Sequence, residues 1–164
     1  MMEPVEVELA EQEAYPRALA RAIRLLTRRE HSEQEIRNKL HEEYAPAVIE
    51  SVIRVCRERD WLNEERLLAM VIRSRAARGY GPRRLYQELR LKGIAAEQIK
   101  SALEACECDW FAVAREQARR KSADPASLDR TGLAKLMNYL QRRGFSVEQA
   151  RYACRPTDDS AADR

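Results

Sequence analysis

The densest group of chemically useful side chains lies between residues 73 and 92. Seven basic residues stand there against the single acid Glu88, a balance of +6, with Tyr80 and Tyr86 interleaved. The basic members are Arg73, Arg75, Arg78, Arg83, Arg84, Arg90 and Lys92. Guanidinium and ammonium groups pair with phosphates or carboxylates, and tyrosine rings stack on bases. We therefore expect a surface that binds a polyanion; the alternative is a solvated helix face with two core tyrosines.

Two further basic groups follow towards the C-terminus. The first consists of Arg115, Arg119, Arg120 and Lys121. The second is the pair Arg142 and Arg143 at the end of an expected helix. Cations there also favour the negative end of the helix dipole, so capping and binding explain this pair equally well.

Motifs for catalysis or metal binding are missing from the sequence. We find no Gly-rich phosphate loop, nucleophile elbow or HExxH helix. The four cysteines, Cys56, Cys106, Cys108 and Cys154, form no CxxC pair, and the two histidines lie far from them in sequence. We expect no catalytic residues, metal or cofactor, and a structural role for His31. Cys56 and Cys106 occupy nearly matching positions and are expected to pack as small apolar groups.

Composition sets the class of fold that must carry these residues. The chain has 164 residues, of which 45% are hydrophobic, 35% charged and 6% aromatic, with five Gly and six Pro. Ala, Leu, Arg, Glu and Gln dominate and are good helix formers. The sequence predicts an all-α protein with a highly charged surface. It has no run of 18 apolar residues and no N-terminal apolar segment, so we expect no membrane span and a cytoplasmic location.

Charge is distributed unevenly around the net value of +3. Residues 1–14 contribute −5, residues 155–164 contribute −1, and residues 15–154 therefore carry +9. A basic body indicates an acidic or polyanionic partner. The acidic N-terminal segment is expected to be a solubilising tail, and it is also able to compete for the basic surface.

An apolar pattern recurs three times at an interval of about fifty residues. Each unit has an apolar pair four residues apart, a short loop with one apolar residue, and a second amphipathic helix. Leu40 and Leu89 are 49 residues apart, and Leu89 and Leu140 are 51 apart. Such units bury little surface alone, so neighbours are expected to pack end to end in an elongated, curved array.

Start and stop signals divide these units into helices. Ser32 and Ser146 each begin a capping box, Pro46 and Pro82 suit first helical turns, and Gly93 suits a helix end. The expected helices span about 16–29, 33–42, 46–58, 64–78, 82–91, 96–105, 110–121, 131–143 and 147–154. The expected repeats are residues 15–60, 61–108 and 109–154, between flexible tails at 1–14 and 155–164. Trp61 and Trp110 stand beside the boundaries and are expected to pack between repeats.

Several stretches resemble the RecX family of bacterial recombination regulators. The matching stretches are residues 29–32 (REHS) with Glu35, Arg37, Lys39 and Leu40; residues 61–66 (WLNEER); residues 78–82 (RGYGP) with Glu88, Leu89 and residues 92–94 (KGI); and residues 134–136 (AKL) with residues 140–146 (LQRRGFS). The resemblance runs from about Tyr15 to Cys154. The chain departs from the family pattern at Asn63, where Asp is more usual, and at Leu67, where an aromatic is common.

The resemblance implies three tandem three-helix repeats, with helix-turn-helix-like units, and a protein without enzymatic activity. It implies binding to the RecA recombinase and to RecA–DNA filaments. It further implies restraint of RecA ATP hydrolysis, strand exchange and co-protease activity, and so a role in recombination, DNA repair and the SOS response. The alternatives are a DNA-binding protein that acts without RecA and a helical adaptor for another acidic protein. Weak direct DNA binding and a monomeric state are also expected.

Overall fold

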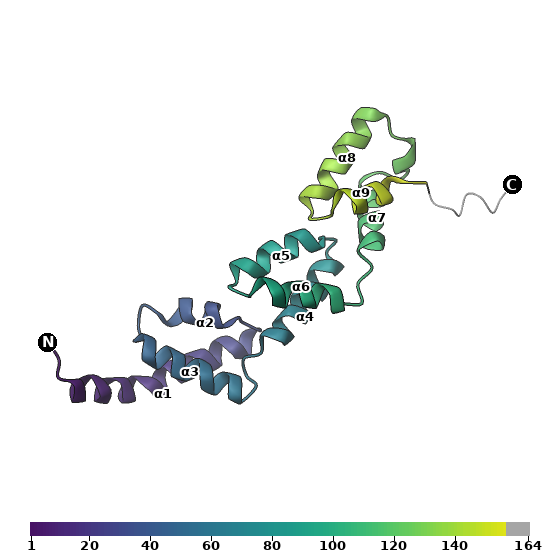
Figure 1. Ribbon diagram of the computed structural model, residues 1–164. Coiled ribbons are helices and arrows are strands. Elements are labelled where there is room, and N and C mark those ends of the chain that lie inside the picture. The colour runs from purple at the N-terminus through teal and green to yellow at the C-terminus, as the bar shows by residue number, and fades with distance from the viewer. Residues whose placement is uncertain (157–164) are drawn as a thin grey trace. The chain divides into compact units, whose positions relative to one another are not determined.

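The structure of the protein, a computed structural model, describes residues 1–156. This part of the chain is helical and contains no strand (Figure 1). The elements are α1 (Pro4–Arg28), α2 (Glu33–Leu40), α3 (Pro46–Glu58), α4 (Glu64–Ala77), α5 (Pro82–Leu91), α6 (Ala96–Ala105), α7 (Trp110–Lys121), the short 3₁₀ helix η1 (Pro125–Ser127), α8 (Arg130–Arg142) and α9 (Val147–Cys154). The predicted helices from α2 to α9 are confirmed to within two residues at each end. The expected C-terminal tail lies mostly outside the described residues.

Helix starts follow from local side chains, as the sequence predicted. The Ser32 hydroxyl accepts from the Glu35 amide at 3.0 Å, and the Glu35 carboxylate accepts from the Ser32 amide at 3.2 Å. Ser146 and Gln149 form the same reciprocal pair at the start of α9, at 3.1 and 2.9 Å. These contacts satisfy amides that have no partner within the helix. Both predicted capping boxes are therefore confirmed.

Helix α1 begins twelve residues earlier than the sequence analysis placed it. Residues 4–14, expected as a tail, form its first turns. Pro4 occupies the first turn, and Glu3 and Glu6 form a capping box there. The expected helix starts at about residue 16, but α1 continues through Pro16 at the loss of one backbone hydrogen bond. The buried residues of α1 are Ala18 and Ala22, so its first turns add helix without adding core.

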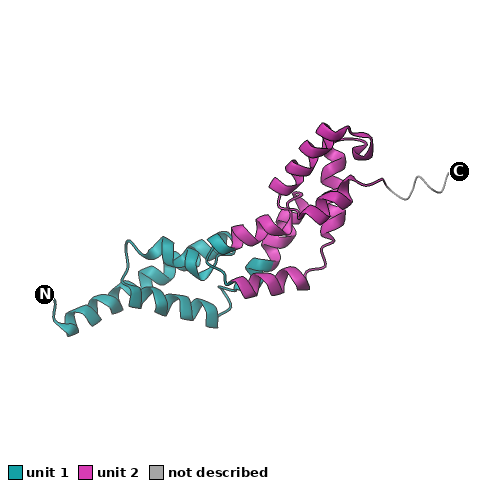
Figure 2. Ribbon diagram, turned by 45° about the horizontal axis from the view of Figure 1, so that its top comes forward, with its two compact units in different colours: residues 1–68, 90–95 teal, residues 69–89, 96–164 magenta. Residues whose placement is uncertain are grey.

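The chain divides into two compact units, shown in Figure 2. Unit 1 comprises residues 1–68 and 90–95, and unit 2 comprises residues 69–89 and those from 96 on. The middle repeat is thus shared between the two units. Residues 90–95 belong to unit 1, and there the Ser32 hydroxyl donates to the Lys92 carbonyl at 2.6 Å. The elongated, curved array stays a prediction.

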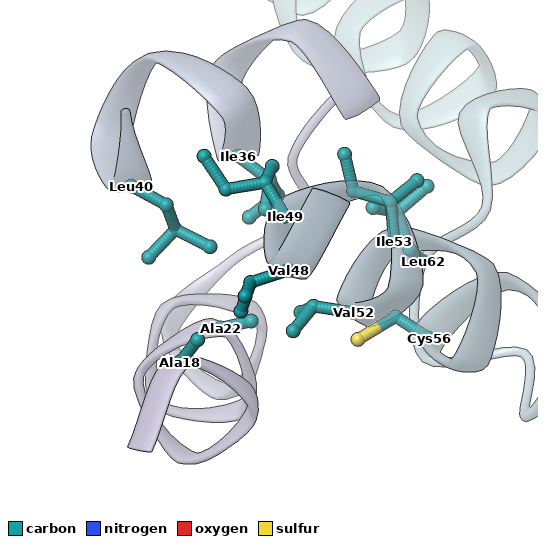
Figure 3. Packing of buried hydrophobic residues seen from close by; sticks show 10 residues of the cluster. All are labelled: Ala18, Ala22, Ile36, Leu40, Val48, Ile49, Val52, Ile53, Cys56 and Leu62. Atoms are coloured by element: carbon teal, nitrogen blue, oxygen red, sulfur yellow. The ribbon is translucent and has the colours of Figure 1, made fainter. Parts of the chain in front are cut away.

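The core of unit 1 is built around α3. Figure 3 shows Val48 and Val52 on the side of α1, where Ala18 and Ala22 leave room for close approach. The neighbouring row on α3, Ile49 and Ile53, lies towards α2. Cys56 is completely buried in this core, which confirms its predicted apolar role, and burial raises the pKa of its thiol.

The core of unit 2 collects small residues of α7 and α9 around large ones of α8. Ala114 and Ala118 of α7 share this core with Leu140 of α8 and with Phe145, which follows α8, and all four are completely buried. The repeat pattern is confirmed, because Leu40, Leu89 and Leu140 each have 0% exposure.

Trp61 does not enter a core, contrary to expectation. Its side chain is 41% exposed, and the Arg59 guanidinium lies 5.9 Å from its ring centroid. Asp60 adopts a left-handed conformation with φ of 59°, and after this turn Leu62 is the residue that is buried. Trp110 is half-buried, and its predicted packing between repeats stays a prediction. Among the described residues, no helix is both long and apolar enough to cross a bilayer.

Candidate functional site

The structure assigns structural partners to several cations of the 73–92 stretch. Arg90 and Lys92 belong to unit 1, where Arg90 donates to the Ile94 carbonyl at 2.9 Å and Lys92 lies 3.5 Å from the Glu35 carboxylate. Arg75, in unit 2, donates three hydrogen bonds of 2.7 to 3.1 Å to the Glu88 carboxylate, and this pairing raises the pKa of Arg75. These three side chains hold turns and helices in place.

The remaining cations of unit 2 include a group stacked on aromatic rings. Tyr80 lies between two guanidinium groups, with the Arg84 carbon at 4.2 Å and the Arg143 carbon at 4.0 Å from its ring centroid. Arg143 is also 5.9 Å from the ring of Tyr139, and the Lys121 ammonium is 4.7 Å from that ring. Cations and rings therefore alternate, and we call these five residues the cation–aromatic ladder.

Backbone contacts between the start of α5 and the end of α8 bring the ladder together. The Gly81 amide donates to the Arg143 carbonyl at 2.8 Å, and the Arg83 amide donates to the Gly144 carbonyl at 2.9 Å. A Cβ atom on Gly81 would lie 2.5 Å from the Gly144 backbone. Gly144 has a φ of +104°, and a Cβ there would lie 2.7 Å from the Arg84 nitrogen. Both glycines are needed for this approach.

Arg143 has a second set of contacts that fix its position. Its Nε donates to the Gly79 carbonyl at 3.2 Å, and one of its Nη atoms donates to the Arg78 carbonyl. The guanidinium thus closes the turn between α4 and α5 while its face covers Tyr80. For this pair of arginines, sequence reasoning weighed capping against binding. Arg143 instead stabilises a turn some sixty-five residues away in sequence.

The ladder carries uncompensated positive charge. Within residues 1–156, none of its three cations lies within ion-pair distance of a carboxylate. Arg84 and Lys121 are exposed, as are the predicted site residues Arg73, Arg78, Arg83, Arg119 and Arg142. Because Arg84 stacks through the face of its guanidinium, the edge of that group can bind a phosphate or carboxylate. The ladder is therefore suited to bind a polyanion.

The ladder does not include every predicted residue. Arg120 pairs with Glu116 at 2.9 Å along α7. Tyr86 is half-buried and has no place in the ladder. Sequence reasoning missed Tyr139, although it stands four residues before Arg143, a spacing that puts two side chains on one helix face.

His31 has a structural environment, as expected. Its side chain is 3% exposed, and its Nδ1–H donates to the Arg29 carbonyl at 2.9 Å. In the described part of the chain, no three His, Cys, Asp or Glu side chains are grouped so as to hold a metal ion.

Comparison with known families and proteins gives a consistent set of matches. Residues 18–54, 63–103 and 107–154 match the models of the first, second and third three-helix domains of RecX. "Regulatory protein RecX" of Salmonella paratyphi C is 40% identical over 149 residues, covering 82% of this chain and 88% of that protein. Its counterpart in Cronobacter sakazakii is 41% identical over 146 residues, with the same coverage.

Solved structures of similar fold carry the same description. A crystal structure of regulatory protein RecX aligns with a TM-score of 0.73 at 21% identity, covering 92% of this chain and 77% of that one. The crystal structure of RecX from Lactobacillus salivarius aligns with a TM-score of 0.77 at 18% identity, covering 87% and 95%. The three predicted helical repeats therefore have counterparts in solved structures.

Proposed function

This chain belongs to the RecX family of regulatory proteins, and we propose that it binds the RecA recombinase and RecA–DNA filaments and inhibits them. The affected activities would be ATP hydrolysis, strand exchange and co-protease activity during recombination and repair. The protein would act by binding and not by catalysis. A bound regulator can change the geometry of RecA subunits or block addition of the next subunit. Inhibition therefore needs fewer than one regulator molecule per RecA subunit.

The cation–aromatic ladder is the observation that supports this proposal. It offers positive charge without carboxylate partners among the described residues, and its member Arg84 follows the exposed Arg83 at the start of α5. A filament on DNA presents both phosphates and protein carboxylates, and arginine binds both groups through paired N–H donors. The ladder and Arg83 would form the contact with the filament.

The first test is a titration of this protein into RecA assembled on single-stranded DNA, with ATP hydrolysis as the readout. We expect hydrolysis to fall at ratios well below one molecule per RecA subunit. RecA from the same organism should be used. Unchanged hydrolysis over the whole range, together with intact binding to naked DNA, would contradict the proposal.

Charge reversal tests the contact surface. We expect Arg83→Glu with Arg84→Glu to raise the concentration for half-inhibition about tenfold, because it replaces attraction to the filament by repulsion. Acidic residues suit a helix start, so α5 should remain folded. Arg24→Glu with Arg28→Glu, exposed on α1, is the control with the same charge change. Equal loss in both double variants would mean that net charge alone matters.

The positive charge of the ladder, which has no carboxylate partner among the described residues, favours a second candidate, direct DNA binding without RecA. Such binding should weaken steeply with salt and show little sequence preference, because phosphate contacts dominate it. A gel shift with the protein alone at two salt concentrations distinguishes the candidates. Tight, site-specific binding by the protein alone would place this function above RecA regulation.

A further inference from the structure

Unit 2 contains a hollow of about 450 Å³ beside the cation–aromatic ladder. It lies between the end of α7, the segment that follows it, and one face of α8. Lys135, Tyr139 and Arg142 line it from α8, and their spacing of four and three residues places them on the same helix face. Lys121 lines it from the last turn of α7. The volume falls within the range of small-molecule sites.

The lining combines two kinds of chemistry. Its positive groups are Lys121, Lys135 and Arg142, and all three are exposed. Its apolar part is formed by Leu128 and Leu136, together with the Tyr139 ring. No carboxylate occurs among the described residues that line it. No carboxylate within residues 1–156 forms an ion pair with any of the three cations.

We infer that this hollow binds a nucleoside phosphate. Three cations that line the hollow and have no ion-pair partner among the described residues match a phosphate group, which carries charge on several oxygens. An apolar surface with a tyrosine ring suits the flat face of a base. Asn138, which also lines the hollow, adds an amide able to bond base edges. An acidic peptide would use the cations but not the apolar part, so a nucleotide fits the lining better.

The hollow and the cation–aromatic ladder share residues and so form one continuous surface. Tyr139 and Lys121 belong to both, with the Lys121 ammonium 4.7 Å from the Tyr139 ring. A strand of nucleic acid could place one nucleotide in the hollow and its next phosphates along Arg143 and Arg84. The site goes beyond the proposed role with RecA, because the chain alone forms it.

The test uses the full chain without RecA, so its failure is separate from that of the proposed function. Fluorescence anisotropy of a labelled eight-residue oligothymidylate measures binding, with unlabelled thymidine monophosphate, inorganic phosphate and a poly-glutamate peptide as competitors. Amide chemical shifts of the wild-type protein locate the binding site. We expect the largest shifts in residues 121–143, which include the lining of the hollow, and smaller shifts in residues 80–84 around the ladder.

Matched variants make the result specific. Lys135→Glu with Arg142→Glu should weaken oligothymidylate binding at least about tenfold. The slope of log affinity against log salt concentration should fall by the equivalent of about two phosphate contacts. Lys100→Glu with Arg130→Glu, exposed residues of unit 2 outside the hollow, should change affinity less than about threefold. The neutral variant Lys135→Gln with Arg142→Gln should fall between the two. Chemical-shift dispersion reports that each variant is folded.

The competitors distinguish the sources of the ligand. Displacement by thymidine monophosphate at concentrations where inorganic phosphate fails supports a site for free nucleotides as well as for a strand. Displacement by oligonucleotide alone supports a site for a nucleotide within a strand. Preferential displacement by poly-glutamate would overturn the inference, as would the absence of shifts in residues 121–142 or equal affinities in the two double Glu variants.

Discussion

Arg143 links the fold of unit 2 to its candidate site at the scale of a single residue. Its N–H groups donate to the carbonyls of Arg78 and Gly79, while the face of its guanidinium lies 4.0 Å from the Tyr80 ring centroid. A lysine could not make these contacts together, because it lacks a planar group with donors at its edge. Hydrogen bonds from a charged group are stronger than neutral ones, so this residue both positions the turn and supplies charge.

His31 supports a prediction about pH. Burial lowers its pKa from 6.5; nearby Arg29 and Lys92 also lower it, while the hydrogen bond to the Arg29 carbonyl and the charge of Glu35 oppose the shift. The unfolded chain therefore binds a proton near pH 6.5, before the folded chain does. This contribution to stability is present above about pH 6.5 and is lost as the pH falls through the folded-state pKa.

We expect His31→Asn to reduce the change in unfolding free energy between pH 7.5 and 5.5. Urea denaturation at several pH values measures it, and the slope against pH is read separately from any constant loss of packing. His41→Asn, at an exposed position, is the matched control. An unaltered slope in His31→Asn would show that the buried ring does not titrate in this range.

At the scale of elements, the capping boxes at Ser32 and Ser146 have the same local geometry but make different tertiary contacts. Ser146 caps α9 locally, whereas Ser32 caps α2 and also donates to the Lys92 carbonyl at 2.6 Å. Ser32 is completely buried and ties the turn after α5 to the start of α2. Helix α2 is therefore held at its first residue by a contact across sixty residues of sequence.

We expect Ser146→Ala to destabilise the protein by about 1 kcal/mol through loss of the cap. Ser32→Ala should cost about 2–3 kcal/mol, because the Lys92 carbonyl also loses its donor. Thermal or urea unfolding of the two variants provides the comparison. Equal losses would show that the bond to Lys92 adds no stability.

At the scale of the whole molecule, charge is separated along the chain. Residues 1–14 carry a net charge of −5, and residues 4–14 form the first turns of α1. The net charge of the full chain is +3. The five acids, Glu3, Glu6, Glu8, Glu11 and Glu13, oppose the approach of any polyanion. They therefore moderate the attraction produced by the basic body.

Replacing the five acids by Gln should strengthen binding to DNA or heparin. The change raises the net charge from +3 to +8 and keeps the chain length. We expect roughly a fivefold gain at low ionic strength, fading near 1 M salt where charges are screened. Anisotropy measured over a salt series tests it. A gain that persists at high salt would indicate a specific contact instead of general repulsion.

Local signals were enough to predict most helices. Ser32, Ser146, Pro46 and Pro82 act on the backbone within one turn, so their effect can be read without knowing the fold. The repeated apolar pairs likewise predicted the buried leucines. The prediction failed at residues 4–14, which were expected as a tail although they form the first turns of α1.

Tertiary structure decided what no local pattern contains. The sequence by itself determined the helices, the repeat and the supply of cations, because each depends on neighbouring residues. Only the fold separated Arg75, which pairs with Glu88, from Arg84, which joins Arg143 and Lys121 on tyrosine rings. The close approach of Gly81 to Gly144 makes that assembly possible. Such contacts depend on packing between segments some sixty residues apart, and the spacing of charges along a chain does not reveal them.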